Sequence, residues 1–307
     1  MATKRYLPQL SGITHFLALP LTTSTSRPMI SAAYRKIMDD PISSNIPKPA
    51  FHHPEQLFVY LGNLSLGTTQ RINQALTVLD SLDLESMLDR RNRPSLGNQL
   101  CASKNMASSH SILEVKMHGL YLASSPSADI ENTYRLHANV SNGGGLLPRF
   151  CADISESFSG ANLTKYRAVQ TSNSQHLLRG LTTKVVNTKT LYTTVDNENP
   201  YLTEKGIYQK KLACFDATRV LSKYHDMIWT DYFRLEKLCI YELGLFDIVR
   251  DEEVISRGYI EIGNVSLPGA PTVQPEPWIE GGRYVKRRKL PPSPLYKHKP
   301  PQNGSVS

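Results

Sequence analysis

A strand-like segment followed directly by a helix-like segment gives the strongest folding signal in this sequence. The segment Gln56–Gly62 (QLFVYLG) is rich in residues that favour β-strands. Thr68 or Thr69 is placed to cap the helix that follows. Apolar residues then recur at helical spacing, at Ile72, Ala75, Leu76, Leu79 and Leu82. This order of elements predicts a strand packed against its own following helix.

Further strand and helix patterns are spread along the chain in mixed order. Strands are predicted for 13–21, 113–120, 134–140, 181–186, 235–243 and 259–265, and helices for 31–38, 147–158 and 216–224. Residues 113–120 show the apolar and polar alternation of a half-buried strand. No internal repeat of 20–50 residues is visible, so the sequence predicts an α+β domain.

Three regions divide the 307 residues. We expect an N-terminal arm (1–9), a folded domain (10–267) with a polar insertion at about 90–111, and a proline-rich, basic, disordered tail (268–307). The longest apolar runs, such as Phe16–Leu21, are far shorter than the roughly 20 residues that cross a bilayer. We therefore expect no membrane attachment, and the polar N-terminus predicts a protein that is not secreted.

The four cysteines are widely spaced, without a CxxC pair or a Cys/His knuckle. This spacing predicts free thiols in a reducing compartment, with no metal site and no cofactor.

The positive charge is concentrated at the C-terminus. Seven of the net eight positive charges come from residues 283–307, which leaves residues 1–282 nearly neutral. This distribution weighs against a broad nucleic-acid-binding face on the folded domain. The run Lys286, Arg287, Arg288 and Lys289 matches a nuclear-import cluster, so we expect a nuclear or cytoplasmic protein.

Several segments in order resemble one family. They are 13–21 (ITHFLALPL), 54–66, 113–120 (LEVKMHGL), 181–188 (LTTKVVNT) and 215–221 (FDATRVL). Together they resemble the two-histidine (2H) phosphoesterases of the 2′,5′ RNA ligase-like class. Within that class they are most similar to the domain shared by A-kinase anchor protein 7 and activating signal cointegrator 1 complex subunit 1. The resemblance covers roughly residues 10–267.

The resemblance implies a bilobal α+β fold in which two antiparallel sheets face a central cleft, with helices outside. In the family, each half contributes a strand that carries His-x-Thr or His-x-Ser. Residues i and i+2 of a strand point to the same side, so one histidine and one hydroxyl enter the cleft from each half. The two histidines serve as general acid and general base on a 2′,3′-cyclic phosphate or a related ester.

This sequence departs from the family at both histidine positions. The first motif positions are occupied by Phe58 and Tyr60, and the second by Thr182 and Lys184. Phenylalanine cannot transfer a proton, and threonine has no pKa near neutrality. Tyr60 and Lys184 remain able to contact an anion. We therefore predict a pseudoenzyme that binds an RNA end, a nucleotide or a protein partner at the former catalytic centre.

Two alternatives remain open from the sequence. The chain is an active phosphodiesterase on 2′,3′-cyclic or 2′,5′-linked substrates if displaced histidines replace the missing pair. His53 (from the His52-His53 pair), His137 and His176 are the candidates, because they lie in or just before the relevant strands. Otherwise it is an interaction module of the kinase-anchoring or transcription-coactivator type.

Overall fold

The computed structural model describes residues 12–92, 112–122, 129–143, 145–164, 181–188, 201–202, 208–209, 214–271 and 283–286. Two four-stranded sheets form the centre of this part of the chain. Sheet A has the order β12-β9-β1-β2, and every neighbouring pair in it is antiparallel. Its strands are β1 (His15–Pro20), β2 (Phe58–Leu64), β9 (Lys237–Glu242) and β12 (Glu261–Ser266).

Sheet B has the order β5-β4-β3-β8 and is also antiparallel throughout. Its strands are β3 (Glu114–Leu122), β4 (Arg135–Ser141), β5 (Leu181–Asn187) and β8 (Phe233–Arg234). A smaller sheet has the order β11-β10-β13, with β10 (Phe246–Arg250), β11 (Glu253–Gly258) and β13 (Arg283–Lys286). The short strands β6 (Tyr201–Leu202) and β7 (Tyr208–Gln209) pair with each other.

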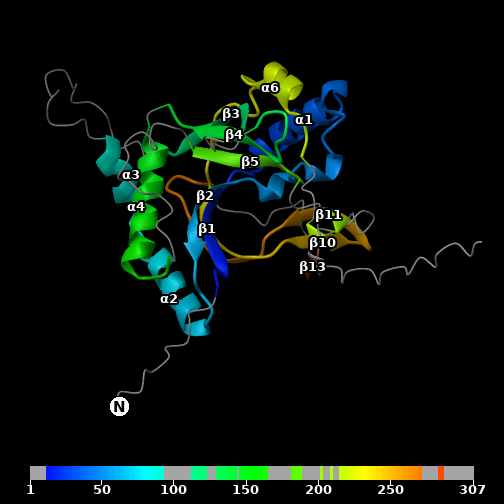
Figure 1. Ribbon diagram of the computed structural model, residues 1–307. Coiled ribbons are helices and arrows are strands. Elements are labelled where there is room, and N and C mark those ends of the chain that lie inside the picture. Colours follow the sequence, from blue (N-terminus) through cyan, green and yellow to red (C-terminus); the bar gives the residue numbers. More distant parts are fainter. Residues whose placement is uncertain are drawn as a thin grey trace, which may run out of the picture.

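Helices flank the two central sheets (Figure 1). The α2 (Thr69–Asp80), α3 (Leu84–Asn92) and α4 (Leu146–Gly160) helices lie on one side of the molecule. The α1 (Ser26–Met38) and α6 (Thr218–Tyr224) helices lie on the other. The 3-10 turns η1 (Pro41–Ser43), η2 (Lys48–Ala50) and η3 (Pro54–Gln56) connect α1 to β2.

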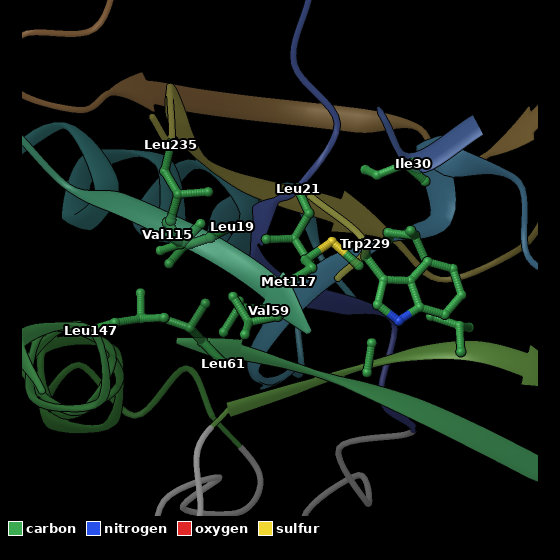
Figure 2. Packing of buried hydrophobic residues seen from close by; sticks show 14 of the residues in the cluster. Leu19, Leu21, Ile30, Val59, Leu61, Val115, Met117, Leu147, Trp229 and Leu235 are labelled. Atoms are coloured by element: carbon green, nitrogen blue, oxygen red, sulfur yellow. The ribbon is translucent and has the colours of Figure 1, made fainter. Parts of the chain in front are cut away.

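One hydrophobic core joins the two sheets and their helices. Figure 2 shows buried residues from β1, β2, β3 and α4 meeting in it, together with Trp229. Alternate residues of β2 and β3 supply this core, because successive side chains of a strand point to opposite faces. Val59 and Leu61 of β2, and Val115 and Met117 of β3, are almost completely buried.

The α+β class with antiparallel sheets, predicted from the sequence, is confirmed. The strand-then-helix unit is present as β2 and α2, and Thr68 Oγ1 accepts a hydrogen bond from the Arg71 N–H at 3.3 Å, as expected of an N-cap. Helix α1 begins at Ser26 rather than Ser31. Four residues of the segment predicted as a disordered tail form β13 instead.

The two strands that carry the motif positions lie at the adjoining edges of the two sheets. β2 is the edge strand of sheet A, and β5 is the edge strand of sheet B. The Phe58 N–H of β2 donates to Thr183 Oγ1 of β5 at 3.3 Å. The motif residues, far apart in the sequence, are therefore on neighbouring strands.

A β-bulge in β5 sets the direction of its side chains. Leu136 pairs with Val186, but the next residue of β4, His137, pairs with Lys184, so Val185 is an extra residue in β5. Without the bulge, strict alternation would put Val186 on the same face as Lys184. With it, both Val185 and Val186 are buried while Lys184 lies on the polar face beside His137.

Gly119 offers a test of this fold. It lies at the irregularity in the pairing of β3 with β4, and its backbone has a φ of +70°. A Cβ added there would collide with the Tyr121 ring. Gly119→Ala should lower the free energy of unfolding by about 1–3 kcal/mol, measured by chemical denaturation. Gly160→Ala is the matched control, since nothing lies within 4 Å of its added Cβ. Equal stability of the two variants would contradict the left-handed conformation of Gly119.

Among the described residues, no helix has the length and apolar character needed to cross a membrane.

Candidate functional site

The strand that carries Phe58 and Tyr60, the first pair of predicted motif positions, contributes to an aromatic cluster. Phe58 packs against Phe16 of β1 with ring centroids 5.0 Å apart. Tyr259 meets Phe58 edge-on at 5.6 Å, and Tyr241 of β9 stacks with Phe16 at 5.3 Å. Tyr60, the second motif position, lies at the margin of this aromatic cluster, 6.1 Å from Phe16. The surroundings of Phe58 therefore suit an apolar ring.

Tyr60 is the accessible member of the aromatic cluster, with 41% of its surface exposed. Burial of the remainder raises the pKa of its phenol to about 12, so the hydroxyl keeps its proton at neutral pH. The Tyr60 hydroxyl can thus donate a hydrogen bond to an anion.

The second motif strand carries a different, cationic group. Lys184 pairs across the strands with His137 of β4, and Thr182 pairs with Asn139. The His137 Nδ1 lies 3.3 Å from Thr182 Oγ1. All four side chains lie on the partly accessible face of sheet B, because the intervening residues Ala138 and Thr183 face the core. Sheet B therefore brings Lys184 and Thr182 together with one of the displaced-histidine candidates.

His52 reaches the same place from the other side of β5. Phe51 forms an antiparallel bridge with Val186, and the His52 N–H donates to the Val185 carbonyl at 3.0 Å. This short backbone pairing adds the Phe51–His52 segment to the outer edge of sheet B. Lys184 thus has His137 on one side and His52 on the other. We call Lys184, His137, Thr182 and His52 the β5 cluster.

The electrostatics of the β5 cluster favour a bound anion. Burial, followed by the charge of Lys184, lowers the pKa of His52 to about 3. Burial lowers the pKa of His137 to about 4, with smaller contributions from Lys184 and Arg135. Both rings are therefore neutral at pH 7, and every charged or titratable side chain that shifts them is basic. A bound anion would attract the Lys184 ammonium and would offset the unfavourable effect of the basic groups on each other.

The histidine rings also have unused hydrogen-bonding atoms. Within the described part of the chain, both ring nitrogens of His52 and the Nε2 of His137 are buried without a hydrogen-bond partner. Buried polar atoms without a partner are costly in folded proteins and often mark a functional site. These nitrogens are available to a ligand that enters the β5 cluster.

The other displaced-histidine candidates lie elsewhere. The pKa of His53 is lowered by burial and then by Arg257, and it is also influenced by Glu55 and Asp247. His53 therefore lies near the ion pairs Arg27–Glu55, which joins α1 to η3, and Arg257–Asp247, which joins β11 to β10. The Ser256 hydroxyl donates to Glu55 and so ties η3 to the small sheet. His176 lies outside the described residues.

Two further predicted features can be placed. Lys286 is the last residue of β13 and pairs with Phe246, whereas Arg287, Arg288 and Lys289 lie outside the described residues. No group of three or more His, Cys, Asp or Glu side chains in the described ranges could hold a metal ion. Cys151, Cys214 and Cys239 are free thiols.

The sequence placed Lys184 and His137 among the candidates, but it named His53, whereas the structure brings its neighbour His52 beside Lys184. One signal was available, because adjacent residues in an extended segment point to opposite sides, so only one of the pair can face β5. Choosing between them required the non-local pairing of Phe51–His52 with Val185–Val186.

Comparison with known proteins finds similarity at the level of structure alone. No family model matches the chain, and no curated protein matches it. Similar solved structures include TT0787 of Thermus thermophilus (9% identity, TM-score 0.39, covering 83% of this chain and 97% of that one). A phosphoesterase (8%, 0.37, 84% and 99%) and E. coli LigT complexed with 3′-AMP (10%, 0.36, 84% and 99%) are also similar.

Proposed function

We propose that this chain is a 2H-phosphoesterase-like protein that binds the phosphate group of an RNA end or a nucleotide through the β5 cluster. The observation that carries the proposal is the position of Lys184 between two neutral histidines whose ring nitrogens are buried and unpartnered among the described residues. Lysine and imidazole N–H groups are strong donors to phosphate oxygens. Thr182 adds a hydroxyl 3.3 Å from His137.

The proposal includes the loss of the family's acid–base pair. Phe58 stands at the first histidine position within the aromatic cluster, and Thr182 stands at the second. General acid–base catalysis of ester cleavage needs two groups that exchange protons on opposite sides of the phosphate. The β5 cluster supplies binding groups from one sheet only, which favours a binding protein.

Binding of a short labelled RNA with a 3′-terminal phosphate, followed by fluorescence anisotropy, tests this proposal. Lys184→Ala should weaken binding about 10- to 100-fold, because a charge-assisted hydrogen bond to phosphate contributes about 1.5–3 kcal/mol. Lys36→Ala is the matched control, since Lys36 is exposed on α1 and should leave the affinity unchanged. Equal affinity of the Lys184→Ala variant and the unmodified chain would refute the proposed site.

A second function is favoured by one observation, the presence of two histidines beside Lys184. If His52 and His137 act as the acid–base pair, the chain is a phosphodiesterase with relocated catalytic groups. The same preparation should then open an RNA 2′,3′-cyclic phosphate, and either His52→Ala or His137→Ala should abolish turnover. No hydrolysis above buffer would leave the binding function, and neither binding nor hydrolysis would favour a protein-interaction module.

A further inference from the structure

The polar face of sheet B continues beyond the β5 cluster, across β4 to β3. Alternate residues of β4 are half-buried on this face, while the residues between them are buried in the core. Strand pairing arranges the side chains of the face in three rows. The rows are Lys184–His137, Thr182–Asn139–His118 and Ser141–Lys116. A ligand held at Lys184 can therefore extend along this face as far as β3.

A second cationic group lies at the far end of the face. The Lys116 Nζ is 5.4 Å from the centroid of the Tyr232 ring. This ring is 51% exposed, and a Cβ added to Gly143, two residues after β4, would lie 3.6 Å from its hydroxyl. An exposed aromatic ring beside a lysine can stack with a nucleobase while the ammonium contacts a neighbouring phosphate.

Polar and uncharged groups connect the two ends. The His118 Nε2 lies 3.1 Å from Ser141 Oγ, and Asn139 stands between His118 and Thr182 in the middle row. Among the described residues of β3, β4 and β5 that share this face, none between Lys184 and Lys116 is acidic. Since residues 1–282 are nearly neutral as a whole, the face is a local concentration of basic groups.

The separation of the two lysines sets the size of the ligand. Two strand spacings of about 4.8 Å each, and four residues of about 3.4 Å each along β4, place their Cα atoms about 17 Å apart. A single nucleotide is shorter than this separation. A strand of about four nucleotides covers it, which is the lower end of the site sizes of single-strand-binding domains.

We propose that the polar face of sheet B binds a short single-stranded RNA, with its terminal phosphate at Lys184 and an internal phosphate and base at Lys116 and Tyr232. This inference rests on the proposed phosphate-binding function and names the ligand as an oligonucleotide rather than a mononucleotide. An acidic peptide would also pair with the lysines, but it has no base to stack on the exposed Tyr232 ring, which favours RNA.

Calorimetric titration with 3′-phosphorylated adenylate RNAs of one, two, four and six nucleotides tests the inference. The affinity of the unmodified chain should rise about tenfold or more between one and four nucleotides, and then level off. Lys116→Ala should remove this gain with length, whereas Lys184→Ala should weaken the binding of every length. Lys36→Ala, at an exposed position on α1, is the matched control and should keep both the affinity and the gain.

Two further measurements separate charge from stacking. Lys116→Ala should lower the slope of log affinity against log salt for the four-nucleotide RNA by about 0.7, as expected for one lost phosphate contact on a single strand. Tyr232→Ala should weaken the binding of this RNA about tenfold, and Tyr232→Phe should restore it, because the ring is retained.

The outcomes distinguish this inference from the proposed function. Equal affinity for one and four nucleotides, or a Lys116→Ala variant that keeps the gain with length, would overturn the extended RNA site while leaving phosphate binding at Lys184 intact. A hexaglutamate peptide that binds as tightly as the four-nucleotide RNA would indicate a peptide ligand and would overturn it too. If the unmodified chain binds none of the RNAs and no inorganic phosphate, the proposed function is wrong as well.

Discussion

Trp229→Ala should lower the free energy of unfolding by about 3–5 kcal/mol, among the largest losses expected from one substitution in this chain. The indole is 2% exposed and packs edge-on against Tyr34 of α1, with ring centroids 5.2 Å apart. Its Nε1–H donates to the Gly119 carbonyl at 2.8 Å. Truncation would leave a cavity between α1 and β3 and would remove the only side-chain donor shown for that carbonyl among the described residues.

Urea denaturation followed by circular dichroism measures this loss. Trp229→Phe should fall between the alanine variant and the unmodified chain, because it keeps most of the buried area but removes the indole N–H that donates to the Gly119 carbonyl. Tyr232→Ala, at a nearby residue that is 51% exposed, should change stability by less than about 1 kcal/mol. A Trp229→Ala variant as stable as Tyr232→Ala would show that the indole is not a core residue.

Phe16→Ala should lower the free energy of unfolding by a similar amount, about 3–5 kcal/mol, because Phe16 is the central ring of the aromatic cluster. It is 2% exposed, and four aromatic rings lie with centroids 4.9–6.1 Å from its own. Aromatic pairs contribute about 0.5–1.5 kcal/mol beyond the area that they bury.

Tyr60→Ala provides the comparison within the same cluster. Tyr60 lies at the margin and is 41% exposed. Tyr60→Ala should therefore lower the free energy of unfolding by less than about half as much as Phe16→Ala, measured under the same denaturation protocol. If the two variants unfold at the same denaturant concentration, the cluster does not have Phe16 at its centre, and Phe58 is not held as described.

Local patterns in the sequence predicted the central strands and helices because those elements follow their own periodicity. The β10–β11 hairpin escaped prediction, since its tight turn uses Asp251 and Glu252, both with positive φ (50° and 66°). Turns of this kind favour Asn-Gly or Asp-Gly, and here Glu252 takes the place of the glycine, so the turn signal in the sequence is weak. Helix α1 begins early because Thr23 and Ser26 hydrogen-bond each other reciprocally, which closes its first turn.

The candidate site was predictable only in part, because contacts between distant segments of the chain determine it. Lys184 was identified from the resemblance of residues 181–188 to the second family motif, and β5 carries it on the polar face of sheet B. The bulge at Val185 and the bridge between Phe51 and Val186 depend on contacts between distant segments, and these contacts decide which histidine meets Lys184. Side-chain periodicity within a single strand carries no information about either feature.

The packing around Phe58 limits which residues position 58 can accept. The Phe58 ring contacts the rings of Phe16, Tyr241 and Tyr259. A polar side chain such as histidine at this position would enter surroundings shaped for hydrocarbon and would need several neighbours to change with it. Position 58 is therefore expected to change only together with its aromatic neighbours, so single substitutions there should be tolerated less well than at the exposed Tyr60.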